Sequence, residues 1–281
     1  MQTEVFTCIK KHRYSLVLML IDAHCHLTSL SQDDLNRVAA RLSSEFLCVN
    51  SSIDLATTEK STALAGQNPY VYAAVGFHPF RAGTYTGSTI SSYRELISRF
   101  RGRVVAIGEI GIDYKADASR EDQEHVFFEF LRLARECALP VMIHSRVDLT
   151  QEPEDTVLET IDRVFSDYRE VVFHCYSYSP ALLARITDKG GTASFSLNIL
   201  RQKKRIIESL RQCPLSQILL ETDSPYMRLR GAATTPLDLE AVYVFAAECK
   251  GVALADLQTQ VAANAARLFR RKEFHDEDRI D

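Results

Sequence analysis

Short runs of apolar and β-branched residues alternate along the chain with longer segments of amphipathic helical pattern. The apolar runs predict eight strands, at residues 16–23, 45–50, 71–76, 103–109, 140–144, 171–174, 192–196 and 217–222. Their continuous apolar character is typical of strands covered on both faces of a parallel sheet. Residues 120–138 carry apolar side chains at helical spacing, and residues 254–270 predict a further helix after the last strand. The pattern therefore indicates an α/β protein built from repeated βα units.

Such a repeat fits a (β/α)8 TIM barrel with an extra C-terminal helix, and it also fits an open doubly wound sheet. Polar residues distinguish the two, because they gather at the predicted C-terminal strand ends: Asp22, His24, His26, Glu109, His144, His174 and Asp223. A barrel brings these ends into one ring, whereas an open sheet spreads them along an edge. We therefore predict one barrel over residues 16–270. Residues 1–15 are expected to be an extension outside the fold, and residues 271–281 a tail too charged to pack.

Composition places this barrel in the ordinary globular class. The chain has 281 residues, 46% hydrophobic and 25% charged. Its net charge of −4 gives no overall attraction to nucleic acid or to anionic membranes, so any polyanion site has to be local. Seven cysteines without a CxxC pair favour a reducing cytoplasm. No apolar run approaches the roughly 20 residues of a membrane span, and no obligate protein partner is evident.

Histidines and carboxylates at the strand ends are candidate metal ligands. His24 and His26 lie two residues apart, so strand alternation places both imidazoles on one face, where they make half of a metal site. Single histidines of later strands are, taken separately, more often core residues than ligands. The complete candidate set is His24, His26, Glu109, His144, His174 and Asp223. Two divalent ions about 3.5–4 Å apart, with Glu109 bridging them and a hydroxide held as nucleophile, would use the whole set.

Six segments around these residues resemble, in order and spacing, the motifs of the TatD family of metal-dependent deoxyribonucleases. They are Ile21–Leu27, Val75–Pro79, Ile107–Tyr114, Pro140–Arg146, Phe173–Ser177 and Leu220–Tyr226. The likeness covers about residues 20–270. It implies a barrel of the amidohydrolase-like superfamily that cleaves phosphodiester bonds in DNA with the help of divalent metal.

The resemblance also implies roles for individual residues. One ion is held by His24, His26, Glu109 and Asp223. The other is held by Glu109, His144 and His174. The substrate-side residues are His78 and Arg146, and a guanidinium can grip a phosphate through two parallel hydrogen bonds. Asp223 is the expected general base. The mixture of nitrogen and oxygen ligands leaves magnesium, manganese and zinc open as the metal.

One departure from the family motifs and one group of basic residues bear on the choice of substrate. Where the family usually has Ser-Gly-Ser after the sixth strand, this chain has Ser177-Tyr178-Ser179, and the ring either narrows the pocket or stacks on a base. Basic residues follow the seventh and eighth strands, where they either bind a DNA backbone or form a solvated helix face. They are Arg201, Lys203, Lys204, Arg205, Arg211, Arg228 and Arg230.

Three functional hypotheses follow. The first is a hydrolase of DNA phosphodiester bonds that acts on single strands or ends, including exonucleolytic trimming. The second is a hydrolase of a small ester or amide, because one barrel serves many chemistries. The lysine that many amidohydrolases carbamylate to bridge two metals is absent where Glu109 stands, which favours the first hypothesis. The third is a catalytically idle binding protein, against which the complete ligand set counts.

Overall fold

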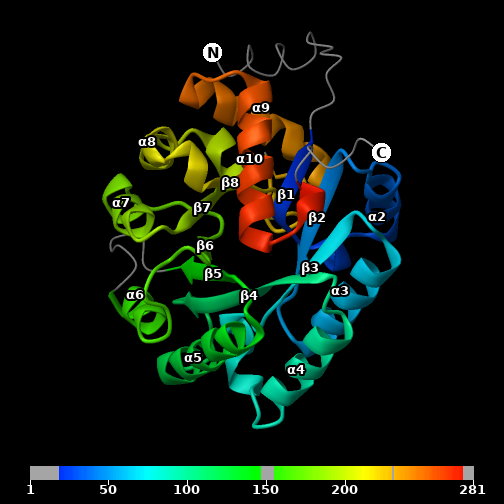
Figure 1. Ribbon diagram of the computed structural model, residues 1–281, viewed down its shortest axis with the longest axis vertical. Coiled ribbons are helices and arrows are strands. Elements are labelled where there is room, and N and C mark those ends of the chain that lie inside the picture. Colours follow the sequence, from blue (N-terminus) through cyan, green and yellow to red (C-terminus); the bar gives the residue numbers. More distant parts are fainter. Residues whose placement is uncertain (1–18, 147–154, 230, 275–281) are drawn as a thin grey trace.

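Eight parallel strands in the order β1 to β8 form a sheet that curls into a barrel, with helices around its outside (Figure 1). The computed structural model describes residues 19–146, 155–229 and 231–274. The strands are β1 (Leu20–Cys25), β2 (Phe46–Ser51), β3 (Val71–Val75), β4 (Val104–Asp113), β5 (Val141–Arg146), β6 (Val171–Phe173), β7 (Thr192–Phe195) and β8 (Ile218–Leu220). The predicted (β/α)8 barrel is therefore confirmed.

A helix follows each strand, and one more helix closes the barrel. They are α2 (Gln32–Ala39), α3 (Leu55–Gln67), α4 (Thr89–Arg99), α5 (Arg120–Cys137), α6 (Asp155–Asp162), α7 (Pro180–Asp188), α8 (Lys204–Gln212), α9 (Leu239–Lys250) and the additional α10 (Leu254–Phe269). Short 3-10 helices are η1 (Leu27–Ser29), η2 (Pro79–Thr84), η3 (Leu197–Arg201), η4 (Leu215–Gln217), η5 (Pro236–Asp238) and η6 (Lys272–Phe274). Among the described helices, none combines the length and the apolar character that a membrane crossing requires.

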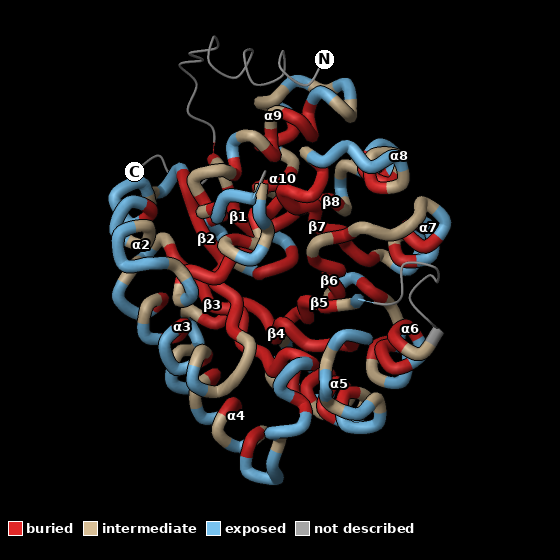
Figure 2. The backbone as a smooth tube through the Cα atoms, turned by 180° about the vertical axis from the view of Figure 1, so that it is seen from behind, coloured by how far each residue is buried: buried red, intermediate tan, exposed pale blue. Residues whose placement is uncertain are grey.

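The hydrophobic core lies inside the barrel wall and between the wall and the helices. The strands are buried along most of their length, whereas the outward faces of the helices are exposed (Figure 2). Helix α10 is fixed at the N-terminal ends of the strands, because the Asn264 side-chain amide donates hydrogen bonds to the Leu215 carbonyl (2.7 Å) and to the Ile218 carbonyl (2.8 Å). The opposite, C-terminal ends of the strands remain available for a functional site.

Two boundary predictions need correction. Strand β4 continues to Asp113, so Glu109 lies within this strand and not at its end. The expectation of a tail that does not pack from Arg271 onward is wrong for the short helix η6, because Phe274 is fully buried and its ring lies 4.7 Å from the ring of Tyr72. The residues next to Phe274 in sequence are mostly charged, but the aromatic ring of Phe274 packs against the barrel and holds this segment there. The predicted extension at residues 1–15 lies outside the described residues.

The barrel is joined between its first and last strands by contacts of Asp22. The Asp22 carboxylate accepts hydrogen bonds from the Thr222 backbone amide (2.9 Å) and the Thr222 hydroxyl (2.6 Å). Beyond them the Asp223 amide donates to the His24 carbonyl (3.0 Å), and the His26 amide donates to the carbonyl of Ser224 (2.8 Å). These bonds connect the segments that carry two candidate histidines and one candidate carboxylate.

Replacing Asp22 by Asn should change how stability depends on pH. Burial raises the pKa of Asp22 to about 8, against the hydrogen bonds from Thr222, which lower it. The unfolded chain gives up this proton near pH 4, so the folded state binds more protons than the unfolded state between about pH 4 and 8. The wild-type free energy of unfolding should therefore fall with rising pH relative to that of Asp22→Asn, measured by urea unfolding in EDTA. A constant difference between the two proteins would contradict this.

Candidate metal centre

The structure brings four of the predicted ligands together at the C-terminal end of β1. They are His24, His26, Glu109 of β4 and Asp223. His24 and His26 approach each other to 3.1 Å between their Nε2 atoms. Glu109 Oε1 lies 3.6 Å from His24 Nε2 and 3.2 Å from His26 Nε2. Asp223 Oδ1, which follows β8, lies 3.8 Å and 3.7 Å from the same two nitrogens. Two carboxylates, one from β4 and one from the segment after β8, therefore face the same pair of imidazoles.

A second group forms on the other oxygen of the same carboxylate. Glu109 Oε2 lies 3.1 Å from His144 Nδ1 and 2.8 Å from His174 Nε2. The two histidine nitrogens are 3.2 Å apart. Glu109 thus presents one oxygen to each pair of imidazoles. Every residue that the sequence predicted as a ligand lies in one of these two groups.

Glycines allow Glu109 to take this place in the wall. A Cβ on Gly76 of the neighbouring strand end would lie 2.3 Å from the carbonyl carbon of Gly108 and 2.5 Å from the Glu109 amide nitrogen. On the other side, a Cβ on Gly111 would lie 1.9 Å from the His144 carbonyl oxygen, and Gly111 has a φ of +145°, which side-chain-bearing residues rarely adopt. Glycine is required at both positions for β4 to fit between its neighbours with Glu109 pointing inward.

Three of the four imidazoles have a partner at their second nitrogen, whereas His174 Nδ1 makes no hydrogen bond among the described residues. His26 Nδ1 donates to the Ser51 carbonyl (3.1 Å), and His144 Nε2 donates to Asp113 Oδ2 (2.9 Å). His24 Nδ1 lies 3.0 Å from the Ser51 hydroxyl. Because a nitrogen that donates to a carbonyl or carboxylate carries the proton, the nitrogens of His26 and His144 that face Glu109 keep free lone pairs in their neutral forms. This is the arrangement that a metal ligand needs.

The charges of the two groups shift the pKa values in opposite directions. Burial alone would raise the pKa of Glu109, but the imidazoles of His174 and His24 and the hydrogen bonds from neighbouring histidines hold it well below its usual range. Burial would lower the pKa of His26, but the nearby carboxylates of Asp223 and Glu109 outweigh it and raise this pKa to about 9. The pKa values of His144 and His174 are raised for the same reason. His24 differs, because burial and the neighbouring His174 lower its pKa. Without metal, the centre therefore combines raised and lowered imidazole pKa values around an ionised Glu109.

His78 and Arg146, the predicted substrate-side residues, lie beside the second group. The His78 ring is 4.3 Å from the His144 ring, and its Nδ1 accepts the Phe80 amide hydrogen (3.1 Å). Burial lowers the pKa of His78 to about 3, so its imidazole is neutral and its Nε2 carries the hydrogen. Arg146 ends β5 with a half-exposed side chain, and its guanidinium lies 3.4 Å from Asp113 Oδ2.

Two acidic residues of the site escaped the sequence analysis. Asp113 contacts both His144 and Arg146, and it was missed because β4 was expected to end at Glu109. Glu221 is fully buried, accepts a hydrogen bond from the Cys175 amide (2.7 Å), and lies 3.5 Å from His174 Nδ1. Its signal was its place two residues before Asp223, since alternation puts both on one face of an extended chain.

Tyr178, which stands where the family usually has glycine, packs against neighbouring residues. The Tyr178 hydroxyl donates to the Ser145 carbonyl, and the ring lies 5.7 Å from the ring of Tyr176. Tyr178 is partly buried against the hydrophobic core. The ring therefore braces the segment after β6 against the end of β5, which leaves it unsuited to stack on a base.

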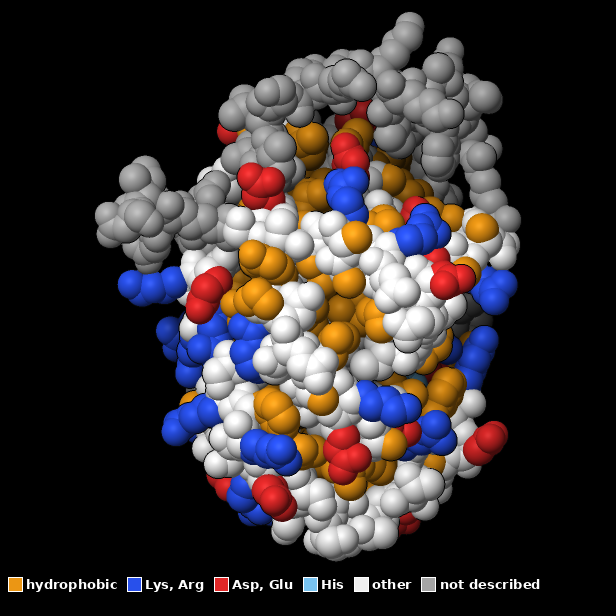
Figure 3. All heavy atoms as spheres, turned by 90° about the vertical axis from the view of Figure 1, so that its right-hand side faces the viewer, with side chains coloured by type: hydrophobic (Ala, Val, Ile, Leu, Met, Phe, Trp, Pro, Cys, Tyr) orange, Lys and Arg blue, Asp and Glu red, His pale blue; other side chains and the backbone are white. Residues whose placement is uncertain are grey.

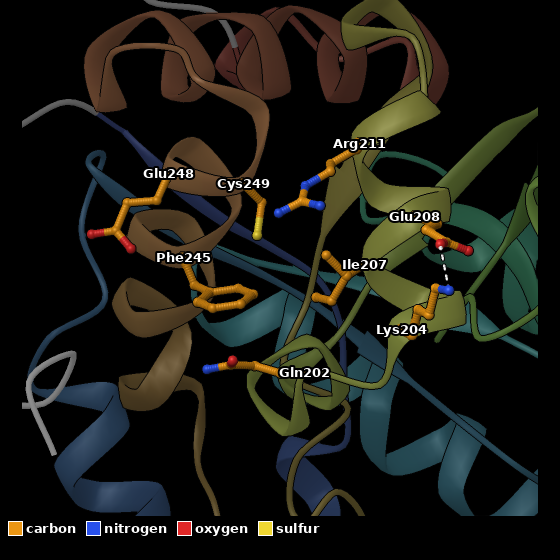
Figure 4. Close-up of a pocket in the computed structure, with 8 residues that line it drawn as sticks. All are labelled: Gln202, Lys204, Ile207, Glu208, Arg211, Phe245, Glu248 and Cys249. Carbon is orange, nitrogen blue, oxygen red and sulfur yellow. Dashed lines mark ion pairs between the residues drawn. The ribbon is translucent and has the colours of Figure 1, made fainter. Parts of the chain in front are cut away.

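Two of the basic residues after β7 lie beside acidic side chains. Lys204 and Arg211 of α8 line a cavity of about 450 Å³ between α8 and α9, together with the acidic side chains of Glu208 and Glu248 (Figure 4). Lys204 pairs with Glu208 at 3.8 Å. On another face of the molecule, basic and acidic side chains are also interspersed (Figure 3). The predicted residue Arg230 lies outside the described residues.

Both groups fit a divalent metal ion. Four ligands about 2.1 Å from a tetrahedral ion lie about 3.4 Å apart. The separations between an imidazole nitrogen and another donor range from 3.1 to 3.8 Å in the first group and from 2.8 to 3.2 Å in the second. The donors are imidazole nitrogens and carboxylate oxygens, which zinc, manganese and related ions accept.

Comparison with known proteins agrees with this chemistry. Residues 21–270 match the family described as TatD related DNase. An uncharacterized metal-dependent hydrolase of Bacillus subtilis, YabD, is 30% identical over 260 residues, covering 90% of this chain and 99% of the relative. A 3'-5' ssDNA/RNA exonuclease TatD of Cronobacter sakazakii is 32% identical over 226 residues, covering 76% of this chain and 83% of the relative.

A solved structure is similar in fold. The crystal structure of YJJV, a TatD homolog from Escherichia coli, matches with a TM-score of 0.80 at 24% identity, and the match covers 91% of this chain and 99% of that chain. The family match extends over nearly all of the described barrel and includes every residue of the two candidate ligand groups. The chain therefore belongs to the TatD related DNase family and is a metal-dependent hydrolase of that family.

Proposed function

We propose that this protein hydrolyses phosphodiester bonds of DNA, acting on single strands or strand ends. The observation that carries the proposal is the Glu109 carboxylate, whose two oxygens face two separate pairs of imidazoles at the open end of the barrel. A neutral imidazole and a guanidinium, from His78 and Arg146, lie next to it. Donors of this kind suit an anionic phosphodiester better than a neutral ester or amide.

We assign two divalent ions to the centre. His24, His26, Glu109 and Asp223 would hold one ion. Glu109, His144 and His174 would hold the other. When bound, such ions neutralise charge on phosphoryl oxygens and lower the pKa of a coordinated water toward about 7. Magnesium, manganese and zinc all remain candidates, because the donor set mixes imidazole with carboxylate.

Asp223 is our candidate for the general base. Burial alone would raise the pKa of this carboxylate, but the nearby imidazoles of His26, His174 and His24 lower it below its ordinary value, so Asp223 is ionised and able to accept a proton. Its side chain is 14% exposed compared with 5% for Glu109, so water reaches Asp223 more readily. Glu109 is placed to bridge and Asp223 to take the proton of the attacking water.

His78 and Arg146 are assigned to the substrate phosphate. His78 offers an Nε2–H to an anionic oxygen, because its Nδ1 already accepts the Phe80 amide hydrogen. Arg146 is steadied by Asp113 on one side, and its remaining N–H groups are able to form a bidentate contact with a phosphate. A phosphate held by both would lie beside the His144 side of the centre.

Nucleic acid as the substrate is supported by the relative from Cronobacter sakazakii, whose name assigns it exonuclease action on single-stranded DNA and RNA. We extend this activity to the present chain, with DNA as substrate and RNA as the alternative for the same chemistry. We also place the activity in the cytoplasm, because the described cysteines are free thiols, which persist in a reducing compartment.

Removal of metal should abolish cleavage. We expect protein stripped with EDTA to leave end-labelled single-stranded DNA intact, and at least one of Mg²⁺, Mn²⁺ or Zn²⁺ to restore shortening of the labelled strand. The products are resolved by denaturing gel electrophoresis. If no metal restores cleavage while a small nitrophenyl ester is hydrolysed, the small-molecule hypothesis replaces this one.

Replacing Asp223 by Asn should keep the fold and reduce DNA hydrolysis by about 10²–10⁴-fold, the usual contribution of a positioned general base. The amide retains the size of the carboxylate but cannot accept a proton at neutral pH. Initial rates with saturating metal measure the loss, and circular dichroism checks the fold. Asp33→Asn, an exposed carboxylate on α2, is the matched control and should keep full activity. Wild-type rates in Asp223→Asn would remove this residue from the mechanism.

Metal affinity should rise with pH. An ion binds the deprotonated imidazole, and the nearby carboxylates raise the pKa of His26 to about 9 in the metal-free protein despite the opposing effect of burial. Metal binding must therefore displace protons, and the apparent Kd for Mn²⁺ should fall as pH rises from about 6 to 9. Calorimetry in buffers of different ionisation enthalpy counts the protons released. A Kd that does not change over this range would show that the imidazoles are already neutral.

A further inference from the structure

Three large hydrophobic side chains are exposed among the described residues, and all of them are aromatic. Phe80 is 52% exposed, Tyr114 is 48% exposed and Tyr226 is 55% exposed. A single exposed hydrophobic residue is normal in a globular protein and needs no special cause. These three are unusual because of where they lie.

Each ring follows a strand at the C-terminal mouth of the barrel. Phe80 lies in η2, after β3, and Tyr114 directly follows the last residue of β4. Tyr226 lies three residues after Asp223, beyond β8. In a closed barrel of eight strands, three strands lie between β4 and β8 in either direction, so these two strands lie on opposite sides of the mouth. The rings therefore flank the metal centre from two sides.

Phe80 and Tyr114 adjoin the part of the centre that contains His144. The Phe80 ring lies 4.9 Å from the His78 ring, edge to face, and His78 in turn lies 4.3 Å from His144. Tyr114 follows Asp113 in the chain, and its amide donates to the Arg146 carbonyl (2.9 Å). The Lys115 ammonium lies 5.7 Å from the Tyr114 ring and adds positive charge there.

Tyr226 adjoins the opposite part of the centre. Its ring lies 4.7 Å from the His26 ring at an interplanar angle of 71°. Its hydroxyl lies 3.1 Å from the Ser29 hydroxyl in η1, which fixes the tilt of the ring. More than half of the Tyr226 surface still faces solvent in this position.

We propose that Phe80, Tyr114 and Tyr226 form a stacking platform for unpaired nucleobases on both sides of the phosphate to be cleaved. The proposal rests on the function proposed above and specifies its substrate: a strand whose bases are free of pairing and of neighbour stacking. Aromatic stacking does not distinguish one base from another, because every base has a π face. In a duplex both faces of each internal base are already covered, so the platform selects single strands and frayed ends.

The test compares oligonucleotides with and without bases. A short single-stranded DNA is prepared in two forms, one ordinary and one in which tetrahydrofuran spacers replace the terminal bases. We expect the manganese-loaded wild type to show kcat/KM at least about tenfold higher on the ordinary strand, the effect of losing one or more stacked bases. Tyr226→Leu and Phe80→Leu should reduce this ratio toward one, whereas Tyr226→Phe, which keeps the ring and loses the hydroxyl, should preserve it.

A second measurement needs no cleavage. Stacking quenches the fluorescence of 2-aminopurine, and the chain has no tryptophan to obscure that emission. Metal-stripped wild type and Tyr226→Phe should quench a strand with terminal 2-aminopurine, and Tyr226→Leu should quench it less.

The outcomes separate this inference from the proposed function. Cleavage with equal kcat/KM on both strands, or quenching that the leucine variants leave unchanged, overturns the platform and leaves the nuclease proposal standing. Quenching that depends on the rings, in a protein that cleaves no strand with any metal, supports the platform as a binding surface and overturns the nuclease proposal.

Discussion

The centre of this protein depends on one buried carboxylate. Glu109 has 5% of its side chain exposed, and its two oxygens lie within 3.6 Å of four imidazole nitrogens. A carboxylate removed from water is costly unless positive charge or hydrogen bonds compensate for it. Here the compensation comes from β1, β5 and the end of β6, strands that are far apart in sequence. The barrel can satisfy Glu109 only when all of them are in place, so the fold and the site form together.

Closure of the barrel supplies the remaining ligand. The Asp22 carboxylate ties Thr222 to β1, and the next backbone bond joins Asp223 to His24. Asp223 adopts a left-handed backbone with a φ of 53°, so the chain turns there directly after the contact. The carboxylate is thereby carried back over His24 and His26. A polar contact in the wall thus determines the distance between the first and last strands of the metal site.

The sequence predicts the barrel and the candidate ligands because the apolar runs recur along the chain and the candidate ligands lie at the ends of these runs. Apolar runs define the strands, and the six candidate ligands follow or end those runs. Asp113 escaped prediction because β4 was expected to end at Glu109, and the alternation that relates Glu221 to Asp223 does not reveal the approach of Glu221 to His174. Phe274 escaped prediction because charged neighbours dominate its surroundings in sequence, whereas in space it meets Tyr72 and Phe269. The pattern of residues along the chain does not reveal which side chains meet in the folded protein.

Asp113 connects the candidate metal ligand His144 with the candidate phosphate-binding residue Arg146. Its Oδ2 contacts the imidazole of His144, which faces Glu109, and the guanidinium of Arg146, which faces outward. An arriving anion that draws Arg146 toward itself leaves this oxygen with a single donor. The bond to the imidazole then strengthens, and the opposite ring nitrogen becomes more electron-rich. Anion binding at the entrance would in this way change the basicity of His144 in the interior.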